Sequence, residues 1–245
     1  MKPAAPLRLT VTPDQVGPDS IRLTREQTHY ASHVRRLRSG APLLLLGRDG
    51  GQWEGRLSDD GTEALELTAS FPDQPTSGRL ILAAALLRAH RWEWLLEKAV
   101  EVGADEIQPL LLEHNVAKPS DREASKIDRW QRIIEAAAAQ CGTRRLPTLA
   151  PPATLADWLK LCPEGSSLLF CDETSPLTPW PALAETTCLV IGPEGGLAPA
   201  ERAALLAAGG RAVGLGPRIL RAESAGMASL VIARALLDGR VTHGG

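Results

Sequence analysis

The sequence predicts an α/β protein with two domains, a small β-barrel module over residues 1–72 and a larger α/β domain over residues 73–245. Up to residue 70 the apolar residues come in short alternating runs between Gly-rich turns, which is typical of a small all-β unit. Residues 71–78 contain two prolines and show no periodicity, so we expect a linker there. Beyond residue 79, apolar runs alternate with amphipathic segments. This alternation predicts a mainly parallel sheet with helices on both faces.

The amino-terminal module is expected to contain four strands and one helix. The strands are predicted at residues 7–11, 43–46, 52–57 and 64–69. The helix should begin after Thr24, because Thr24 and Gln27 have the spacing of a capping box, in which each side chain bonds the other residue's backbone N–H.

The second domain is expected to follow a strand-then-helix order throughout. Strands are predicted at residues 80–87, 107–112, 167–171, 189–191 and 212–215. Helices are predicted at residues 92–102, 124–140, 154–161, 199–208 and 224–237. Lys98 and Glu101 on the first of these helices have the i,i+3 spacing of an ordinary surface ion pair.

Charge is unevenly distributed although the formal net charge is only −2. That total argues mildly against a nucleic-acid-binding protein. Residues 22–38, however, hold five arginines and two histidines against one acid. On a helix starting after Thr24, the side chains of Arg25, His29, His33 and Arg36 would share one face. This stripe is either a surface that follows phosphates or a solvated helix face.

The four cysteines, at positions 141, 162, 171 and 188, have no C-x-x-C spacing and no nearby histidine partners. They support neither a zinc site nor a thioredoxin-like motif, and reduced, buried thiols are expected, with no bound metal. The chain shows no signal-peptide pattern and no apolar run of membrane-spanning length. A soluble, cytoplasmic protein is therefore expected.

The predicted strand 189–191 runs into the loop Gly-Pro-Glu-Gly-Gly, residues 192–196. Glycines here would let the backbone approach a ligand closely. The spacing matches neither a dinucleotide fingerprint nor a phosphate loop. The Glu194 carboxylate repels phosphate but suits a cation, such as the sulfonium of S-adenosylmethionine, or a ribose hydroxyl. A tight strand-to-helix turn is the other reading of this loop.

A second loop, residues 214–225, places Arg218, Arg221 and Glu223 between the predicted strand 212–215 and helix 224–237. The arginine guanidinium donates two hydrogen bonds at once to a phosphate or to a polarised base oxygen, so two arginines at a strand end indicate a binding site. A plain salt bridge from Arg218 or Arg221 to Glu223 is the alternative. Together, the two loops suggest one ligand pocket.

The pair of loops, Gly-Pro-Glu-Gly-Gly and Leu-Gly-Pro-Arg-Ile-Leu-Arg-Ala-Glu-Ser-Ala, resembles the RsmE family of ribosomal RNA uridine-N3 methyltransferases in the SPOUT superfamily. The similarity extends to residues 94–103, to Ala139-Gln140-Cys141-Gly142 with Pro147, and to His33–Arg38. The chain departs from the family pattern at Ala139 and Thr143, with Arg144 one place later than the usual arginine. It also has Ala198 where a helix-capping Ser or Thr is usual, a loss of about 1 kcal/mol.

This resemblance implies S-adenosylmethionine-dependent methylation of N3 of a uridine in 16S rRNA of the small ribosomal subunit. It also implies an amino-terminal PUA-like β-barrel that binds RNA, a carboxy-terminal SPOUT α/β domain with a trefoil knot, and a homodimer. Dimerisation would bury the small-residue helix 224–237. The implied cofactor-binding residues are Ile191, Gly192, Glu194, Gly195, Gly196, Leu215, Gly216, Ile219, Leu220 and Ala225. The implied RNA-binding residues are Arg25, His33, Arg35, Arg36, Arg38 and Arg144.

Methylation of uridine N3 requires the loss of its proton, and therefore a base or a cation that stabilises the uridinate. Arg221 is the predicted cation, and Glu223 is a candidate base or an orienting group for the arginine. Two alternatives stay open: a SPOUT methyltransferase acting on another RNA position, and a non-enzymatic RNA-binding protein of ribosome assembly.

Overall fold

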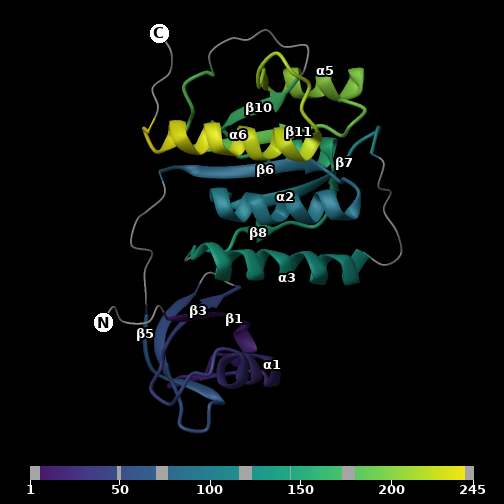
Figure 1. Cartoon of the computed structure of the whole chain (residues 1–245). Helices are drawn as coiled ribbons and strands as arrows, with labels where there is room; N and C mark the ends of the chain where they lie inside the picture. The colour runs from purple at the N-terminus through teal and green to yellow at the C-terminus, as the bar shows by residue number, and fades with distance from the viewer. Residues whose placement is uncertain are drawn as a thin grey trace. The chain divides into compact units, whose positions relative to one another are not determined.

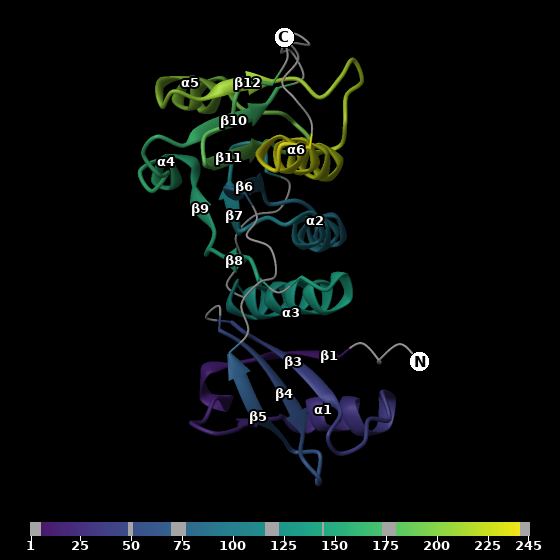
Figure 2. The same ribbon diagram turned by 90° about the vertical axis from the view of Figure 1, so that its left-hand side faces the viewer.

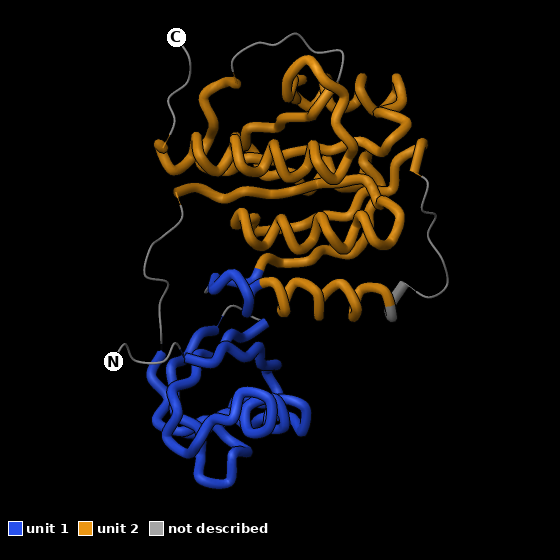
Figure 3. The backbone as a smooth tube through the Cα atoms, viewed as in Figure 1, with its two compact units in different colours: residues 1–75, 138–146 blue, residues 76–137, 147–245 orange. Residues whose placement is uncertain are grey.

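The computed structural model describes residues 6–48, 51–69, 77–115, 123–143, 145–172 and 180–240. Arg144 and most of the predicted linker lie outside these ranges. The chain divides into two compact units, one of residues 1–75 with 138–146 and the other of residues 76–137 with 147–245 (Figure 3). The first unit thus includes a short segment that the sequence analysis gave to the second domain. The predicted boundary at residues 72 and 73 falls outside the described residues.

The first unit contains a five-stranded mixed sheet with the order β1-β3-β4-β5-β2 (Figures 1 and 2). Its strands are β1 (Leu7–Val11), β2 (Ile21–Arg22), β3 (Pro42–Gly47), β4 (Gln52–Leu57) and β5 (Glu63–Ala69). The β1–β3 pair is parallel and the other pairs are antiparallel. Alternate residues of β1 are buried, as strand periodicity requires. Because β1 and β2 end this order, the described strands form a half-barrel where the sequence predicted a small β-barrel.

The helix of this unit begins as predicted but ends earlier. In α1 (Arg25–His29), Gln27 N donates to Thr24 Oγ1 at 3.2 Å and Thr24 N donates to Gln27 Oε1 at 2.8 Å, which confirms the capping box. A π-helical turn, η2 (Tyr30–Val34), follows, and Arg36 has a φ of 52°. The prediction that Arg36 shares a helix face with Arg25 and His29 is therefore wrong, because the wider turn and the left-handed residue break the helical spacing.

The turn between β4 and β5 gives a prediction for acid titration. Ser58 Oγ and Thr62 Oγ1 donate to the Asp60 carboxylate at 2.6 and 2.7 Å, and these bonds lower its pKa to about 2. Because the pKa is lower when folded, the bonds stabilise the fold fully above the unfolded pKa of about 3.9, and this contribution disappears as pH falls through about 2. NMR titration of the Asp60 carboxyl carbon should give this low midpoint, and Ser58→Ala should raise it. A wild-type midpoint near 4 would contradict the prediction.

The second unit is built on a parallel sheet with the order β12-β10-β11-β6-β7-β8, and β9 also pairs with β7. Its strands are β6 (Arg79–Ala85), β7 (Glu106–Leu111), β8 (Thr148–Leu149), β9 (Ala153–Thr154), β10 (Ser167–Cys171), β11 (Thr186–Ile191) and β12 (Arg211–Val213). All of these pairings are parallel, as predicted. Only the two-residue strands β8 and β9 were not predicted, because two residues show no periodicity.

Helices lie on both faces of this sheet, which confirms the predicted α/β arrangement (Figure 2). They are α2 (Ala89–Val102), α3 (Glu123–Cys141), α4 (Leu155–Leu159), α5 (Pro199–Ala207) and α6 (Ala222–Leu237). Helices α2 and α6 cover one face, and α4 lies on the other. At the start of α5, the Glu201 carboxylate accepts from Ala198 N at 2.9 Å and from Glu113 N at 2.8 Å. The bond to the Ala198 N–H is the half of a capping box that Glu201 supplies, and the other half, a side-chain acceptor at Ala198 for an N–H of the first helical turn, is missing.

Helix α6 buries much of its small-residue surface inside its own chain. It packs against α2, β6 and β11. A Cβ atom on Gly226 would lie only 2.8 Å from Leu95 Cδ1, so a side chain here would require the Leu95 side chain to move. Val231 stays 48% exposed. We expected dimerisation to bury the small residues of α6. Within the chain, α2 and the sheet already cover much of this surface.

Four other predictions concern the cysteines, one ion pair, membrane spans and metal sites. All four cysteines are free, but Cys141 is exposed where buried thiols were expected. Lys98 and Glu101 form the expected pair, with 2.6 Å between Nζ and Oε1. Among the described residues, no helix is long and apolar enough to cross a membrane, and no group of three or more His, Cys, Asp or Glu side chains is placed to hold a metal ion.

Candidate functional site

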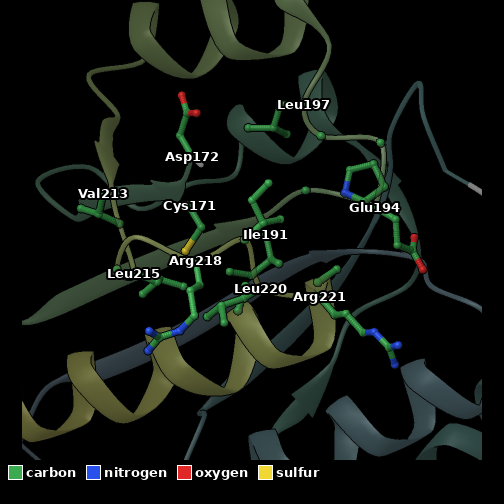
Figure 4. Close-up of a pocket in the computed structure, with 18 of the residues that line it drawn as sticks. Cys171, Asp172, Ile191, Glu194, Leu197, Val213, Leu215, Arg218, Leu220 and Arg221 are labelled. Carbon is green, nitrogen blue, oxygen red and sulfur yellow. The ribbon is translucent and has the colours of Figure 1, made fainter. Parts of the chain in front are cut away.

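The two predicted loops lie together at the carboxyl ends of neighbouring strands. Strand β10 pairs with both β11 and β12, so the loops that follow β11 and β12 emerge at the same edge of the sheet. Between them is a cavity of about 680 Å³, also lined by the end of β10 and the first turns of α6 (Figure 4). Ligands of open parallel sheets bind at this edge.

The structure brings all ten predicted cofactor-binding residues to this one cavity. Its lining includes Ile191, Gly192, Glu194, Gly195, Gly196, Leu215, Gly216, Ile219, Leu220 and Ala225. Arg218 and Arg221 also line it. The sequence analysis missed Cys171, Asp172, Leu197, Arg202 and Val213, which line it too. The position of Cys171 and Asp172 at the end of the predicted strand 167–171 was the signal that could have found them.

The wall of the cavity is largely backbone. Gly196 has a φ of 74° and Gly216 a φ of 118°, conformations that side chains disfavour. A Cβ atom on Gly192 would lie 3.2 Å from Leu197 Cγ, so that loop is packed tightly against the residue that ends it. Peptide groups and apolar side chains therefore form most of the surface that a ligand would contact.

Two carboxylates line the cavity, and each is paired with an arginine. Arg91 Nη1 donates to Glu194 Oε1 at 2.7 Å, and Arg202 Nε donates to Asp172 Oδ2 at 2.7 Å. Cys171 also lines the cavity, and burial raises the pKa of its thiol to about 12, so this thiol stays protonated at neutral pH. The cavity thus combines apolar side chains with two arginine-paired carboxylates, which can still accept hydrogen bonds from hydroxyl or ammonium groups of a ligand.

Glu223 has a different partner from the one that the sequence suggested. It lies in the first turn of α6, is 9% exposed, and does not line the cavity. Its Oε1 is 3.6 Å from Arg91 Nε. Glu223 therefore pairs with Arg91, and the salt bridge to Arg218 or Arg221 and the orienting role towards those arginines are not what the structure shows. Sequence reasoning missed Arg91, which is distant from both loops along the chain and belongs to no recognisable motif.

The two loop arginines lie differently. Arg221 is the N-cap residue of α6, and its side chain extends to the same side as the Glu194 carboxylate (Figure 4). The Arg218 side chain points another way. Only one of the two can therefore face a base at a given position beside the cavity.

The predicted RNA-binding residues of the first unit are all exposed. These are Arg25, His33, Arg35, Arg36 and Arg38. The His29 and His33 rings stack with 4.7 Å between their centroids. Arg144, the sixth predicted residue, lies outside the described residues.

Comparisons with known sequences indicate the family of the chain. A sequence model of the RNA methyltransferase domain matches residues 74–234. The chain is 35% identical to ribosomal RNA small subunit methyltransferase E of Synechocystis over 94% of this chain and 78% of that protein. It is 27% identical to the Bacillus subtilis protein of that name over 85% of this chain and 87% of that protein.

Solved structures extend the comparison to the fold. Ribosomal RNA small subunit methyltransferase E of Neisseria gonorrhoeae, bound to S-adenosylmethionine, superimposes with a TM-score of 0.82 at 25% identity, covering 95% of this chain and 98% of that chain. A Legionella pneumophila methyltransferase with bound S-adenosylmethionine gives a TM-score of 0.77 at 25% identity, with the same coverage of both chains. The chain therefore belongs to the RNA methyltransferase family, among the ribosomal RNA small subunit methyltransferases E.

Proposed function

We propose that this protein transfers the methyl group of S-adenosylmethionine to N3 of a uridine in 16S rRNA of the small ribosomal subunit. The observation that carries the proposal is the single cavity formed by the two loops, which all ten predicted cofactor residues line. Relatives named for small-subunit rRNA methylation, and neighbours with S-adenosylmethionine bound, support the same activity.

The residues of the cavity fit S-adenosylmethionine. A volume of about 680 Å³ lies in the range of small-ligand pockets. Ile191, Leu215 and Leu220 offer apolar contact for an adenine ring, and the Glu194 and Asp172 carboxylates offer acceptors for hydroxyl or ammonium groups. When bound, S-adenosylmethionine supplies an electrophilic methyl group whose leaving group is neutral.

The protein's own task is then to prepare the nucleophile. Uridine N3 is protonated at neutral pH, and the charge left after proton loss is shared with O2 and O4. The Arg221 side chain, which extends from the N-cap of α6 and lines the cavity, would bind one of these oxygens through its guanidinium and favour the uridinate. Glu223 is buried and paired with Arg91, so its contacts favour a structural role over the role of a base.

The wider proposal follows the family. Residues 1–72 would be a PUA-like RNA-binding domain that uses Arg25, His33, Arg35, Arg36 and Arg38, together with Arg144. Residues 73–245 would be a SPOUT domain with a trefoil knot. The protein would act as a cytoplasmic homodimer. The half-barrel of the first unit and the exposure of its basic residues are compatible with the RNA-binding part of this proposal.

One experiment tests the activity. Purified protein is incubated with labelled S-adenosylmethionine and unmodified small subunits, free 16S rRNA or tRNA, and the nucleosides are analysed by mass spectrometry. We expect 3-methyluridine from rRNA. A different methylated nucleoside would move the protein to another RNA position, and the absence of both product and cofactor binding would favour the non-enzymatic alternative.

A further inference from the structure

Arg91 connects the two loops that line the cavity. Its Nη1 lies 2.7 Å from Glu194 Oε1 in the first loop, and its Nε lies 3.6 Å from Glu223 Oε1 in the first turn of α6. In the part of the chain that the structure describes, Arg91 is the only cation in an ion pair with either carboxylate. One guanidinium therefore serves two carboxylates from segments about 30 residues apart.

Both carboxylates depend on this cation, for different reasons. Glu223 is 9% exposed, and its Oε2 is buried without a hydrogen-bond partner in the described structure. A buried carboxylate without a cation is costly, so Glu223 favours the chain arrangement that brings it to Arg91. Glu194 is less buried, with 27% of its side chain exposed, but its bond to Arg91 is the shorter of the two. The loop 192–196 and the first turn of α6 are thus both held to Arg91 on α2.

The position of Arg91 on its helix runs against the usual preference. It lies in the first turn of α2, which contains no acidic residue and follows Arg88 as the N-cap. The helix dipole disfavours a cation at this end. The two carboxylates offset that cost, so Arg91 is more favourable at this position when both are in place.

We propose that Arg91 is a positioning residue that holds the loop 192–196 and the first turn of α6 in the one arrangement that binds S-adenosylmethionine. This role rests on the proposed function. Because both segments line the cavity, loss of the shared cation should let them move apart and weaken cofactor binding. The chemical step should change much less, because Arg91 itself does not line the cavity.

The test measures cofactor affinity and turnover separately. Isothermal titration with S-adenosylmethionine should show a dissociation constant about tenfold higher for Arg91→Ala than for wild type, the scale of one charge-assisted hydrogen bond. The turnover number at saturating cofactor should stay within about threefold of wild type. Arg91→Lys should fall between the two in affinity, because an ammonium keeps the charge but lacks the two-sided fork.

Matched variants separate positioning from general stability. Arg129→Ala removes another arginine that pairs with α2, through Glu93, but lies outside the cavity lining, and should leave affinity unchanged. The affinity losses of Arg91→Ala and Glu194→Gln should not add, so the double variant should bind no more than about twofold more weakly than the weaker single variant.

The outcomes distinguish this role from the activity itself. Unchanged affinity in Arg91→Ala and Arg91→Lys, or fully additive losses with Glu194→Gln, would overturn the positioning role while leaving the proposed function intact. If Arg91→Ala does not fold, Arg91→Lys and Glu223→Gln, each with its own titration, decide the question, because Glu223 pairs with Arg91 and does not line the cavity. Wild-type protein that binds no S-adenosylmethionine would overturn the proposed function and this role together.

Discussion

Arg221→Ala should lower the turnover number for uridine methylation by about 100- to 1000-fold, the usual loss when a donor to a developing negative charge is removed. Arg221 is the N-cap residue of α6 and lines the cavity, and its guanidinium is the cation expected to stabilise the uridinate. The dissociation constant of S-adenosylmethionine should change little, because the pocket wall near this residue is mostly backbone. Single-turnover formation of 3-methyluridine at saturating cofactor, with a parallel cofactor titration, measures both effects.

The neighbouring arginine is the natural control for Arg221. Arg218 is in the same loop and lines the same cavity, but its side chain points another way (Figure 4). Arg218→Ala should therefore cost much less turnover than Arg221→Ala, and Arg221→Lys should retain part of the rate because it keeps the charge. Equal turnover in wild type and Arg221→Ala would remove Arg221 from the mechanism, and a larger loss in Arg218→Ala would transfer the role to Arg218.

Arg234→Ala should reduce the free energy of unfolding by about 3–5 kcal/mol, the cost of breaking a buried ion pair from one side. The Arg234 side chain is 10% exposed and that of Asp105 is 9% exposed. Arg234 Nη2 donates to Gly103 O at 2.5 Å and to Asp105 Oδ2 at 3.1 Å, and Nη1 donates to Ser77 O at 3.1 Å. Its removal takes the guanidinium donor from all three acceptors and leaves Asp105 Oδ2 with the Leu80 N–H, which donates to it at 2.8 Å.

Chemical denaturation followed by circular dichroism would measure this loss. Arg240→Ala is the control, because Arg240 also pairs with an aspartate, Asp238, but is 75% exposed and should contribute less than about 1 kcal/mol. If Arg234→Ala and Arg240→Ala unfold at the same denaturant concentration, the Arg234 network does not stabilise α6 as described.

Most of the second unit could be predicted from the sequence because its strands are continuous apolar runs and its helices have regular periods. Both signals are local, so the order of strands and helices was correct and mainly the ends shifted; α6, for example, begins two residues before the predicted Ser224. The first unit was harder. The two residues of β2 are too few to show a periodicity. No sequence pattern in residues 30–36 predicts a π-helical turn followed by an arginine in the left-handed backbone conformation.

The cavity lining was predictable where it follows a Gly-rich loop, since glycines mark close approach of backbone. The partners of its charged groups were not. Glu223 was expected to pair with the arginines nearest in sequence, yet it pairs with Arg91 from another helix. Such a contact depends on how α2 and α6 pack against each other, and no local sequence pattern predicts that packing.

Because so much of the pocket wall is main chain, an alanine scan would report poorly on it. At Gly192, Gly195, Gly196 and Gly216 such a scan adds a methyl group, and elsewhere it leaves the peptide N–H and C=O groups in place. Resistance to a compound that binds those peptide groups would consequently have few single-substitution routes. Most of these substitutions would have to distort a turn of the pocket wall. They would therefore also impair the binding of S-adenosylmethionine that the proposed activity requires.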